Sequence, residues 1–178
     1  MNSMNILKLK IEANRLSYKT LLLKRNEVLK QCGTKDTNLY LIQSGSLRVY
    51  TIINNIEHCL YLGYKSSAIT AVDSFFGDKQ SNYIIQTIKK SEVHVIKKET
   101  FMDFINSTKE NLRLWQDILV EIIEHHIERG QDLFESSSVD RYDRLKKRAP
   151  ELFQEIPHKY IASYLRMSPE TLSRLKKS

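Results

Sequence analysis

The stretch 159-KYIASYLRMSPETLSRLKKS-178 predicts two short helices joined by a tight turn. Ile161 and Ala162 would lie on the inner face of the first helix, where the small Ala162 lets a second helix cross closely. Ser168 is a favourable N-cap, and Pro169 fits the first position of the second helix, where the absent N–H has no helical partner to lose. A helix, a short turn and a capped second helix match the helix-turn-helix arrangement.

The outer face of the second helix carries side chains suited to DNA. A recognition helix lies in the major groove with its N-terminal residues at base edges. Arg174 can bind guanine O6 and N7 together, and Glu170 can accept a hydrogen bond from cytosine N4. The alternative is an ordinary helical hairpin with a solvated outer face. The predicted DNA-binding surface comprises Lys159, Ser168, Pro169, Glu170, Thr171, Ser173, Arg174, Lys176 and Lys177.

Positive charge is concentrated at this end of the chain. The sequence has 178 residues and a net charge of +7. From Arg141 onward it contains ten Lys and Arg residues and four Asp and Glu residues, so this segment carries +6 and the preceding residues carry +1. A basic segment beside a near-neutral body is typical of nucleic-acid-binding modules, although a solvated basic surface gives the same pattern.

The composition restricts the remaining classes of protein. Apolar residues make up 41 % of the chain and Gly and Pro are few, which favours a globular protein over a disordered or fibrous one. No apolar run approaches the roughly 20 residues of a membrane span, and the N-terminus lacks a signal-peptide core. The two cysteines, Cys32 and Cys59, fit a reducing compartment. We therefore expect a cytoplasmic protein without membrane contact.

Residues 20–98 show the spacing of short strands separated by turn signals. Asn54-Asn55 suits a two-residue hairpin turn because Asn tolerates positive φ, and Gly45 interrupts a run as a bulge or tight turn would. We include the segment 69–78, ITAVDSFFGD, among these strands. The pattern predicts an antiparallel barrel or roll. Before it, residues 1–20 predict a helix whose apolar face holds Ile6, Leu9, Ala13 and Leu16.

The pattern becomes helical after residue 98, with a short helix over 99–105 and a long one over 109–135. The apolar stripe of the long helix is wider than one domain-facing side needs. A homodimer formed through a pair of these helices explains the width, and a single central helix buried in a monomer is the alternative. The predicted dimer interface comprises Leu112, Trp115, Leu119, Ile122, His126 and Leu133.

A polar break at 136–138 separates the long helix from the basic segment. Ser137, with Asp140 three residues later, and Ser138 alone are both suitable N-caps for a helix over 139–148. We take this Ser-rich break as a hinge. The predicted parts are residues 1–108, residues 109–135 and residues 136–178.

The sequence resembles the Crp–Fnr family of transcription regulators. YIASYLRMSPETLSRLKK (160–177) is similar to the family's C-terminal helix-turn-helix, LYLIQSGSLRVY (39–50) is similar to a segment of its β-roll, and DSFFGD (73–78) stands where its Phe-Gly-Glu turn is expected. The resemblance covers about residues 20–178. It implies an α+β protein with an antiparallel, cyclic-nucleotide-binding-like β-roll (a jelly roll), a dimerisation helix and a C-terminal all-α helix-turn-helix domain.

The sequence also departs from the family pattern. The wing hairpin that usually follows the recognition helix is absent from the sequence, which resembles a short, wingless branch. Many members open the recognition helix with a base-reading Arg, whereas this chain has Pro169, so we expect a different DNA sequence to be recognised. Arg166 occupies the turn, where Gly is common and positive φ is expected.

The resemblance also raises the question of a cyclic nucleotide. The family's binders hold the phosphate with an Arg after Phe-Gly-Glu and the ribose with the Glu. Here Asp78 replaces the Glu and Ser81 stands where the Arg is expected, so the phosphate-binding helix should be missing. A buried phosphate without a cation is costly, and we expect no binding of cyclic AMP. The predicted degenerate effector pocket comprises Phe76, Gly77, Asp78, Lys79, Ser81 and Asn82.

The sequence therefore predicts a homodimeric transcription regulator that binds double-stranded DNA. Its effector is either unidentified or absent, and RNA polymerase is a candidate further partner. The alternative is a ligand-sensing β-roll whose C-terminal helices bind a protein. We find no nucleophile–base pair, metal-ligand cluster or Gly-rich phosphate loop in the sequence, so we expect no enzyme, cofactor or metal. His94, His125 and His126 are expected to be structural rather than haem ligands.

Overall fold

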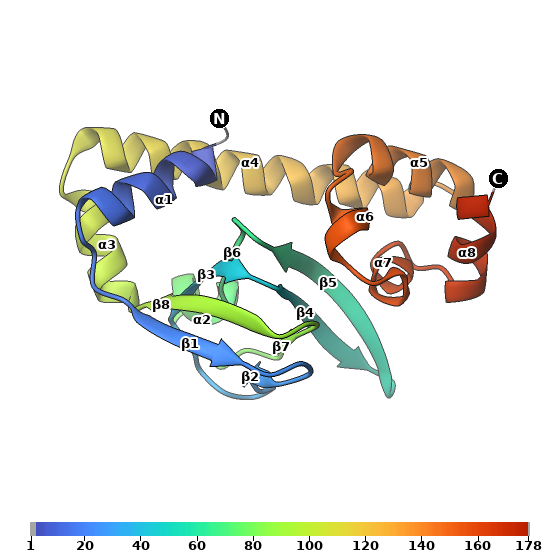
Figure 1. Cartoon of the computed structure of the whole chain (residues 1–178), viewed down its shortest axis with the longest axis horizontal. Helices are drawn as coiled ribbons and strands as arrows, with labels where there is room; N and C mark the ends of the chain where they lie inside the picture. The colour runs from blue at the N-terminus through green and yellow to red at the C-terminus, as the bar shows by residue number, and fades with distance from the viewer. Residues whose placement is uncertain (1–2, 178) are drawn as a thin grey trace.

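An antiparallel β-roll forms the N-terminal body of the protein (Figure 1). The structure, a computed structural model, describes residues 3–177, and side chains as far as residue 175. The predicted antiparallel roll is confirmed. One sheet has the order β1 (Lys19–Leu23), β8 (Ser91–Ile96), β3 (Leu39–Ser44) and β6 (Ala68–Ile69). The other has the order β2 (Val28–Lys30), β7 (Ile84–Thr87), β4 (Ser46–Ile53) and β5 (Ile56–Tyr64).

Two turns of the roll have the predicted backbone. Asn54 and Asn55, between β4 and β5, have φ of 52° and 62°, the values that a tight two-residue hairpin turn requires. Gly45 has a φ of +80°, and a Cβ there would lie 2.3 Å from the carbonyl oxygen of Lys90. A side chain at Gly45 would therefore meet both backbone strain and a steric clash.

The N-terminal helix is shorter than predicted and uses a different face. Helix α1 (Ser3–Ala13) ends seven residues before the expected limit of residue 20 and lies along the long helix α4 (Lys109–Phe134) (Figure 1). Leu7 and Ile11 are buried, whereas Leu9, assigned to the apolar face, is 53 % exposed. The prediction was wrong because contact with α4, which no local pattern reveals, selects the buried face.

Two further helices and α4 enclose one end of the roll. The segment predicted as a strand over 69–78 instead contains helix α2 (Val72–Gly77), while α3 (Lys98–Asn106) is found where a helix was expected. Phe75 of α2 packs edge-to-face on Phe101 of α3, with ring centroids 6.2 Å apart, and Phe101 packs in turn on Trp115 of α4. Burial of this aromatic cluster stabilises α2, which is too short to persist alone.

Four short helices complete the chain. They are α5 (Ser138–Arg148), α6 (Leu152–Glu155), α7 (His158–Tyr164) and α8 (Pro169–Lys177). Ser137 is the N-cap of α5, since its side chain accepts a hydrogen bond from the backbone of Asp140. This bundle lies beside the C-terminal half of α4 and against β5 (Figure 1). No helix within residues 3–177 is long and apolar enough to span a membrane.

Candidate nucleic-acid interface and effector region

Helices α7 and α8 have the predicted helix-turn-helix geometry. The backbone of Thr171 donates to Ser168 Oγ over 3.1 Å, so Ser168 caps α8 as expected. Arg166 adopts a φ of 53° in the turn, and the next N–H, of Met167, donates to the carbonyl of Ala162. A residue in the left-handed region followed by this backbone bond ends α7 and redirects the chain into α8.

The inner faces of the two helices form a dry contact. Ile161 and Ala162 of α7 are fully buried, and Leu172 of α8 is 1 % exposed. Tyr160 and Tyr164 are also buried, on a second face of α7 that contacts β5. That second face was not predicted from the sequence. Its signal is the pair of aromatic residues four positions apart on a helix whose other face is already apolar.

The outer face of the helix-turn-helix is open to solvent. Among the predicted DNA-binding residues, Lys159, Ser168, Pro169, Glu170, Ser173 and Arg174 are exposed and Thr171 is half-buried. Lys176 and Lys177 belong to α8, but their side chains lie outside the described residues. Hydrogen bonds from its own backbone N–H and from Ser168 hold the pKa of Glu170 below its usual range. Glu170 is therefore an acceptor at neutral pH, as contact with cytosine N4 requires.

The helical bundle is packed against the roll rather than held apart from it. One buried cluster joins Cys59 and Leu62 of β5 to Leu145, Tyr160 and Ile161 of the bundle. The two bodies therefore share a continuous apolar core in this structure.

Polar contacts between the roll, α4 and α7 surround that core. Arg129 of α4 donates to the carbonyl oxygens of Cys59 and Tyr164, over 2.8 and 3.3 Å. Arg48 of β4 lies over the ring of Tyr160, 5.0 Å from its centroid. A guanidinium at the C-terminal carbonyls of a helix is favourable, because it offsets the partial negative charge there.

Two arginines hold the junction between α4 and α5. Arg148 donates through Nη2 to Asp132 Oδ2 over 2.6 Å, and Asp132 is 2 % exposed. Arg141 donates through Nη1 to the carbonyl oxygen of Glu135 over 2.6 Å. A buried carboxylate without its cation would be strongly destabilising, so the Arg148–Asp132 pair fixes how α5 leaves α4.

The residues predicted for a dimer interface recur at steps of three, four and seven, so they lie on one side of α4, and the rest of the chain covers them to different extents. Trp115 is 8 % exposed and packs on Phe101 within its own chain. Leu119 packs partly against the same cluster, whereas Leu112 is 40 % exposed. Ile122, which is 39 % exposed, and the exposed His126 line a cavity described below, and Leu133 is half-buried. The predicted residues therefore share one side of α4, but the part of that side around Trp115 is already covered by the same chain.

An adjoining apolar stripe of α4, which shares Leu112 with the predicted set, is exposed. It comprises Leu112, Val120, Ile123, Ile127 and Phe134. Positions 120, 123, 127, 130 and 134 recur at steps of three and four, which places them on one side of the helix. Gly130 lies within this series, and a Cβ there would have no atom within 4 Å. We name these side chains, together with Gly130, the α4 seam.

The predicted effector pocket is occupied by the protein's own backbone. Ser81 is fully buried; its backbone N–H donates to the carbonyl oxygen of Thr34, and its carbonyl oxygen accepts from the N–H of Gly33. The carbonyl oxygen of Ser81 also accepts from the ammonium of Lys30 over 2.5 Å, and that of Tyr83 accepts from the same ammonium over 2.6 Å. Burial lowers the pKa of Lys30. This buried cation was missed by the sequence analysis and already has two hydrogen-bond acceptors.

The other predicted pocket residues lie at the surface. Phe76, Gly77, Asp78, Lys79 and Asn82 are exposed. Asp78 caps α2 in the left-handed region and forms an ion pair with Lys35 over 2.6 Å, and this interaction holds the pKa of Asp78 below its usual range. The chain passes from Asp78 to β7 without an intervening helix. Within the described residues, this region is a closed loop rather than a phosphate-binding cradle.

A roll of two antiparallel sheets, a long helix and a helix-turn-helix bundle together define the architecture of Crp–Fnr transcription regulators. Residues 20–108, half of the chain, match the cyclic nucleotide-binding domain family, and the chain belongs to that family. A comparison with curated protein sequences finds no match.

Solved structures share this fold at low sequence identity. FixK2 from Bradyrhizobium japonicum superposes with a TM-score of 0.74 at 14 % identity, covering 91 % of this chain and 84 % of that one. A CooA mutant from Carboxydothermus hydrogenoformans gives 0.70 at 15 % identity, covering 99 % and 83 %. The c-di-GMP-responsive global regulator CLP of Xanthomonas campestris gives 0.69 at 16 % identity, covering 96 % and 90 %. The resemblance to Crp–Fnr regulators is thus confirmed at the level of the fold.

Proposed function

We propose that this protein is a homodimeric, DNA-binding transcription regulator of the Crp–Fnr type. The observation that supports it most directly is α8, which is capped by Ser168 and anchored by Leu172. Its outer face exposes Glu170, Ser173 and Arg174. An anchored helix with a polar, hydrogen-bonding outer face suits the major groove.

The α4 seam supports the homodimer. Five large apolar side chains on one side of an exposed helix are costly in water unless a partner covers them. Two copies of α4 side by side would cover each other's seam, and Gly130 would permit close approach of the backbones. The proposed interface is therefore the seam, including Leu112 of the predicted set, rather than the face that holds Trp115.

The proposed effector is not a cyclic nucleotide bound in the roll. Ser81 is fully buried in backbone pairing, and Lys30, the buried cation nearby, is held by two carbonyls. Binding a phosphate there would require breaking those bonds before any new one forms. Calorimetry with cyclic AMP and cyclic GMP should show no heat of binding at micromolar concentrations. A micromolar dissociation constant for either nucleotide would refute this part of the proposal.

DNA binding is tested by selecting duplexes from a random pool with the purified protein, then measuring affinity for selected and scrambled duplexes across a salt series. We expect enrichment of a near-palindrome whose half-sites lie about 34 Å apart. Affinity for both duplexes should fall steeply with salt, because Lys and Arg contacts release counterions. No enrichment, together with no duplex binding at low salt, would favour the alternative that the C-terminal helices bind a protein.

A further inference from the structure

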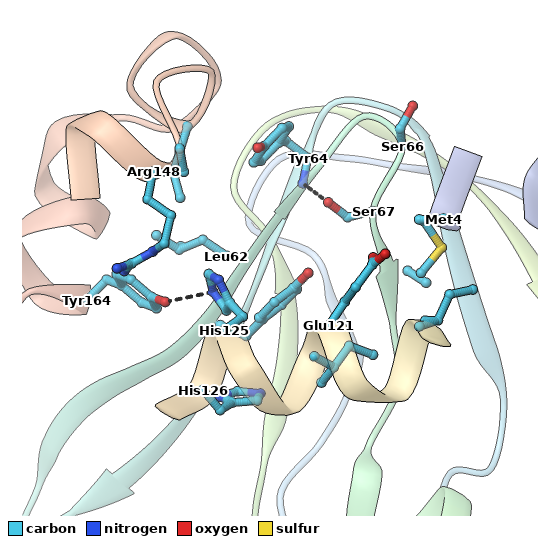
Figure 2. Close-up of a pocket in the computed structure, with 16 residues that line it drawn as sticks. Met4, Leu62, Tyr64, Ser66, Ser67, Glu121, His125, His126, Arg148 and Tyr164 are labelled. Atoms are coloured by element: carbon cyan, nitrogen blue, oxygen red, sulfur yellow. Dashed lines mark hydrogen bonds between the residues drawn. The ribbon is translucent and has the colours of Figure 1, made fainter. Parts of the chain in front are cut away.

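A cavity of about 280 Å³ lies where the roll, α4 and the helical bundle meet (Figure 2). Its walls come from the end of β5 and the turn after it, from one face of α4, from α5 to α7, and from Met4 of α1. No residue of the degenerate effector pocket lines it. The volume is close to the lower limit of small-molecule sites, which are near 300 Å³, so one aromatic ring with a polar group would fit.

The wall of the cavity combines an apolar body with polar groups at its two ends. Leu62, Ile118 and Leu152 supply aliphatic surface. At one end lies the carboxylate of Glu121, and at the other the guanidinium of Arg148 lies beside Tyr164 and His125 (Figure 2). Such a wall favours a ligand with a ring or aliphatic body and a hydrogen-bonding head group.

The guanidinium of Arg148 has hydrogen-bonding capacity left. Its Nη2 donates to Asp132, but its buried Nε makes no hydrogen bond, although Glu128 Oε2 lies 3.4 Å away. No residue that the structure describes accepts from its Nη1. An arginine has five N–H donors, and leaving a buried one without a partner is unfavourable. Nε is inaccessible from the cavity, whereas Nη1 is not among the buried unpaired atoms, so Nη1 is the donor that a ligand's acceptor can use.

The charges around the cavity select against an ionised ligand. An anion at Arg148 would also meet the carboxylates of Glu128 and Asp132, which already neutralise the guanidinium. A cation at Glu121 would enter a partly enclosed, largely apolar space that also contains Arg148. Taking a net charge out of water without a dedicated partner costs more than the contacts would return.

We propose that this cavity is a binding site for a small uncharged molecule with an aromatic body and an amide-like head group, which accepts from Arg148. Such a molecule contacts β5, α4 and α7 at once, so binding favours the docked arrangement of the bundle over any arrangement that separates these elements. The site itself does not depend on DNA binding, but its regulatory consequence rests on the proposed function.

Three probes of the same shape and different charge test the site on the free, full-length protein. Benzamide is neutral, benzoate is an anion and benzamidinium is a cation. Two-dimensional amide NMR should show saturable benzamide binding with a dissociation constant on the order of 1 mM. The shifted signals should cluster at residues 61–68 and 118–126. The two ions should bind about tenfold more weakly.

Two variants that fill the cavity from opposite walls provide the decisive control. Ile122→Trp, on α4, and Ala149→Leu, at the end of α5, should each weaken benzamide binding at least about tenfold. Glu124→Trp, on the solvent side of α4, is the matched control and should bind as the parent does.

Each possible result either supports or overturns the proposed site. Saturable binding that prefers benzamide and is lost in both filled variants supports the site. Absence of saturation up to the solubility limit, equal binding of the three probes, or binding that survives in either folded, filled variant would overturn it. Since no DNA is present, failure here leaves the proposed DNA binding untouched, and failure of DNA binding leaves this result unchanged.

Discussion

Two exposed helical surfaces among the described residues, the α4 seam and the outer face of α8, differ in chemistry. The α4 seam presents Val120, Ile123, Ile127 and Phe134, without a charge among them. The outer face of α8 presents Pro169, Glu170, Ser173 and Arg174, with no large aliphatic side chain. An apolar stripe on an exposed helix requires a protein partner to cover it. A polar stripe with Arg and hydroxyl groups is stable in water and suits a hydrated, charged partner. We therefore propose different partners for the two surfaces, a second copy of the chain for the seam and DNA for the outer face of α8.

The largest effect is expected from charging the seam. Ile123→Asp combined with Ile127→Asp would place carboxylates in the interface, and sedimentation should show a monomer. DNA affinity should fall by about 10²–10⁴, because the two recognition helices would no longer act together. Glu124→Asp, which changes a neighbouring position outside the seam, should remain dimeric. A parent protein that is monomeric at high micromolar concentration would contradict the proposal that the seam binds a second copy of the chain.

The next effect concerns Arg174 on α8. Arg174→Ala should cost about 1–3 kcal/mol per half-site on the selected duplex and relax base preference at one position. Glu170→Ala should reduce discrimination more than affinity, because a carboxylate near phosphates is also repulsive. The measurement is a competition between the selected duplex and single-base variants. Equal losses on selected and random duplexes would show that Arg174 does not contact bases.

A smaller effect is expected from Lys159, at the start of α7. Lys159→Ala should weaken binding to all duplexes alike and reduce the salt slope by about 0.9 for each phosphate contact removed. The slope comes from affinity measured at several salt concentrations, with Arg174→Ala as the comparison for sequence dependence. An unchanged slope would place Lys159 outside the DNA interface.

The smallest effect should come from protonation on the inner side of α4. His125 hydrogen-bonds Tyr164 over 3.2 Å. Burial lowers its pKa from 6.5, and the nearby charges of Arg148, His126 and Arg129 lower it further, against the raising effect of Glu128. The unfolded chain therefore takes up a proton at a higher pH than the folded one. The contribution of His125 to the free energy of unfolding is therefore fully present above pH 6.5 and declines as the pH falls below that value.

Thermal unfolding on either side of pH 6.5 checks this expectation. The melting temperature should fall on acidification by a few degrees, and His125→Gln, which can still pair with Tyr164, should show a smaller fall. Burial also lowers the pKa of His94 and His126, so part of the pH dependence should remain. An identical decline in His125→Gln would remove His125 from the explanation.

Features fixed by neighbouring residues could be predicted from the sequence. The Asn54-Asn55 turn, the Ser168 cap and helix α4 depend on local backbone preferences and periodicity, and all three are present. The inner face of α8 was equally predictable, because Leu172 must be buried if α7 and α8 cross at Ala162. Turns, caps and helices that depend on residues close in the sequence can therefore be predicted from a short stretch of it.

Features that depend on distant contacts were not predictable. Contact with α4 determines which face of α1 is buried. Helix α2 forms because Phe75 is buried on Phe101. The docking of α7 on β5 and the Arg148–Asp132 pair join segments that no spacing rule relates. Lys30 was passed over because a lysine in a strand pattern is normally solvated, and only the approach of Ser81 and Tyr83 explains its burial.

The contact between β5 and the helical bundle also gives the protein two cysteines of very different accessibility. Cys59 lies under the bundle, and burial raises the pKa of its thiol to about 12, whereas Cys32 is exposed on a loop of the roll. A thiol reagent should therefore modify Cys32 at once and Cys59 only while the bundle is detached. The ratio of the two labelling rates, measured by mass spectrometry on the unaltered chain, therefore reports how often the bundle detaches from β5.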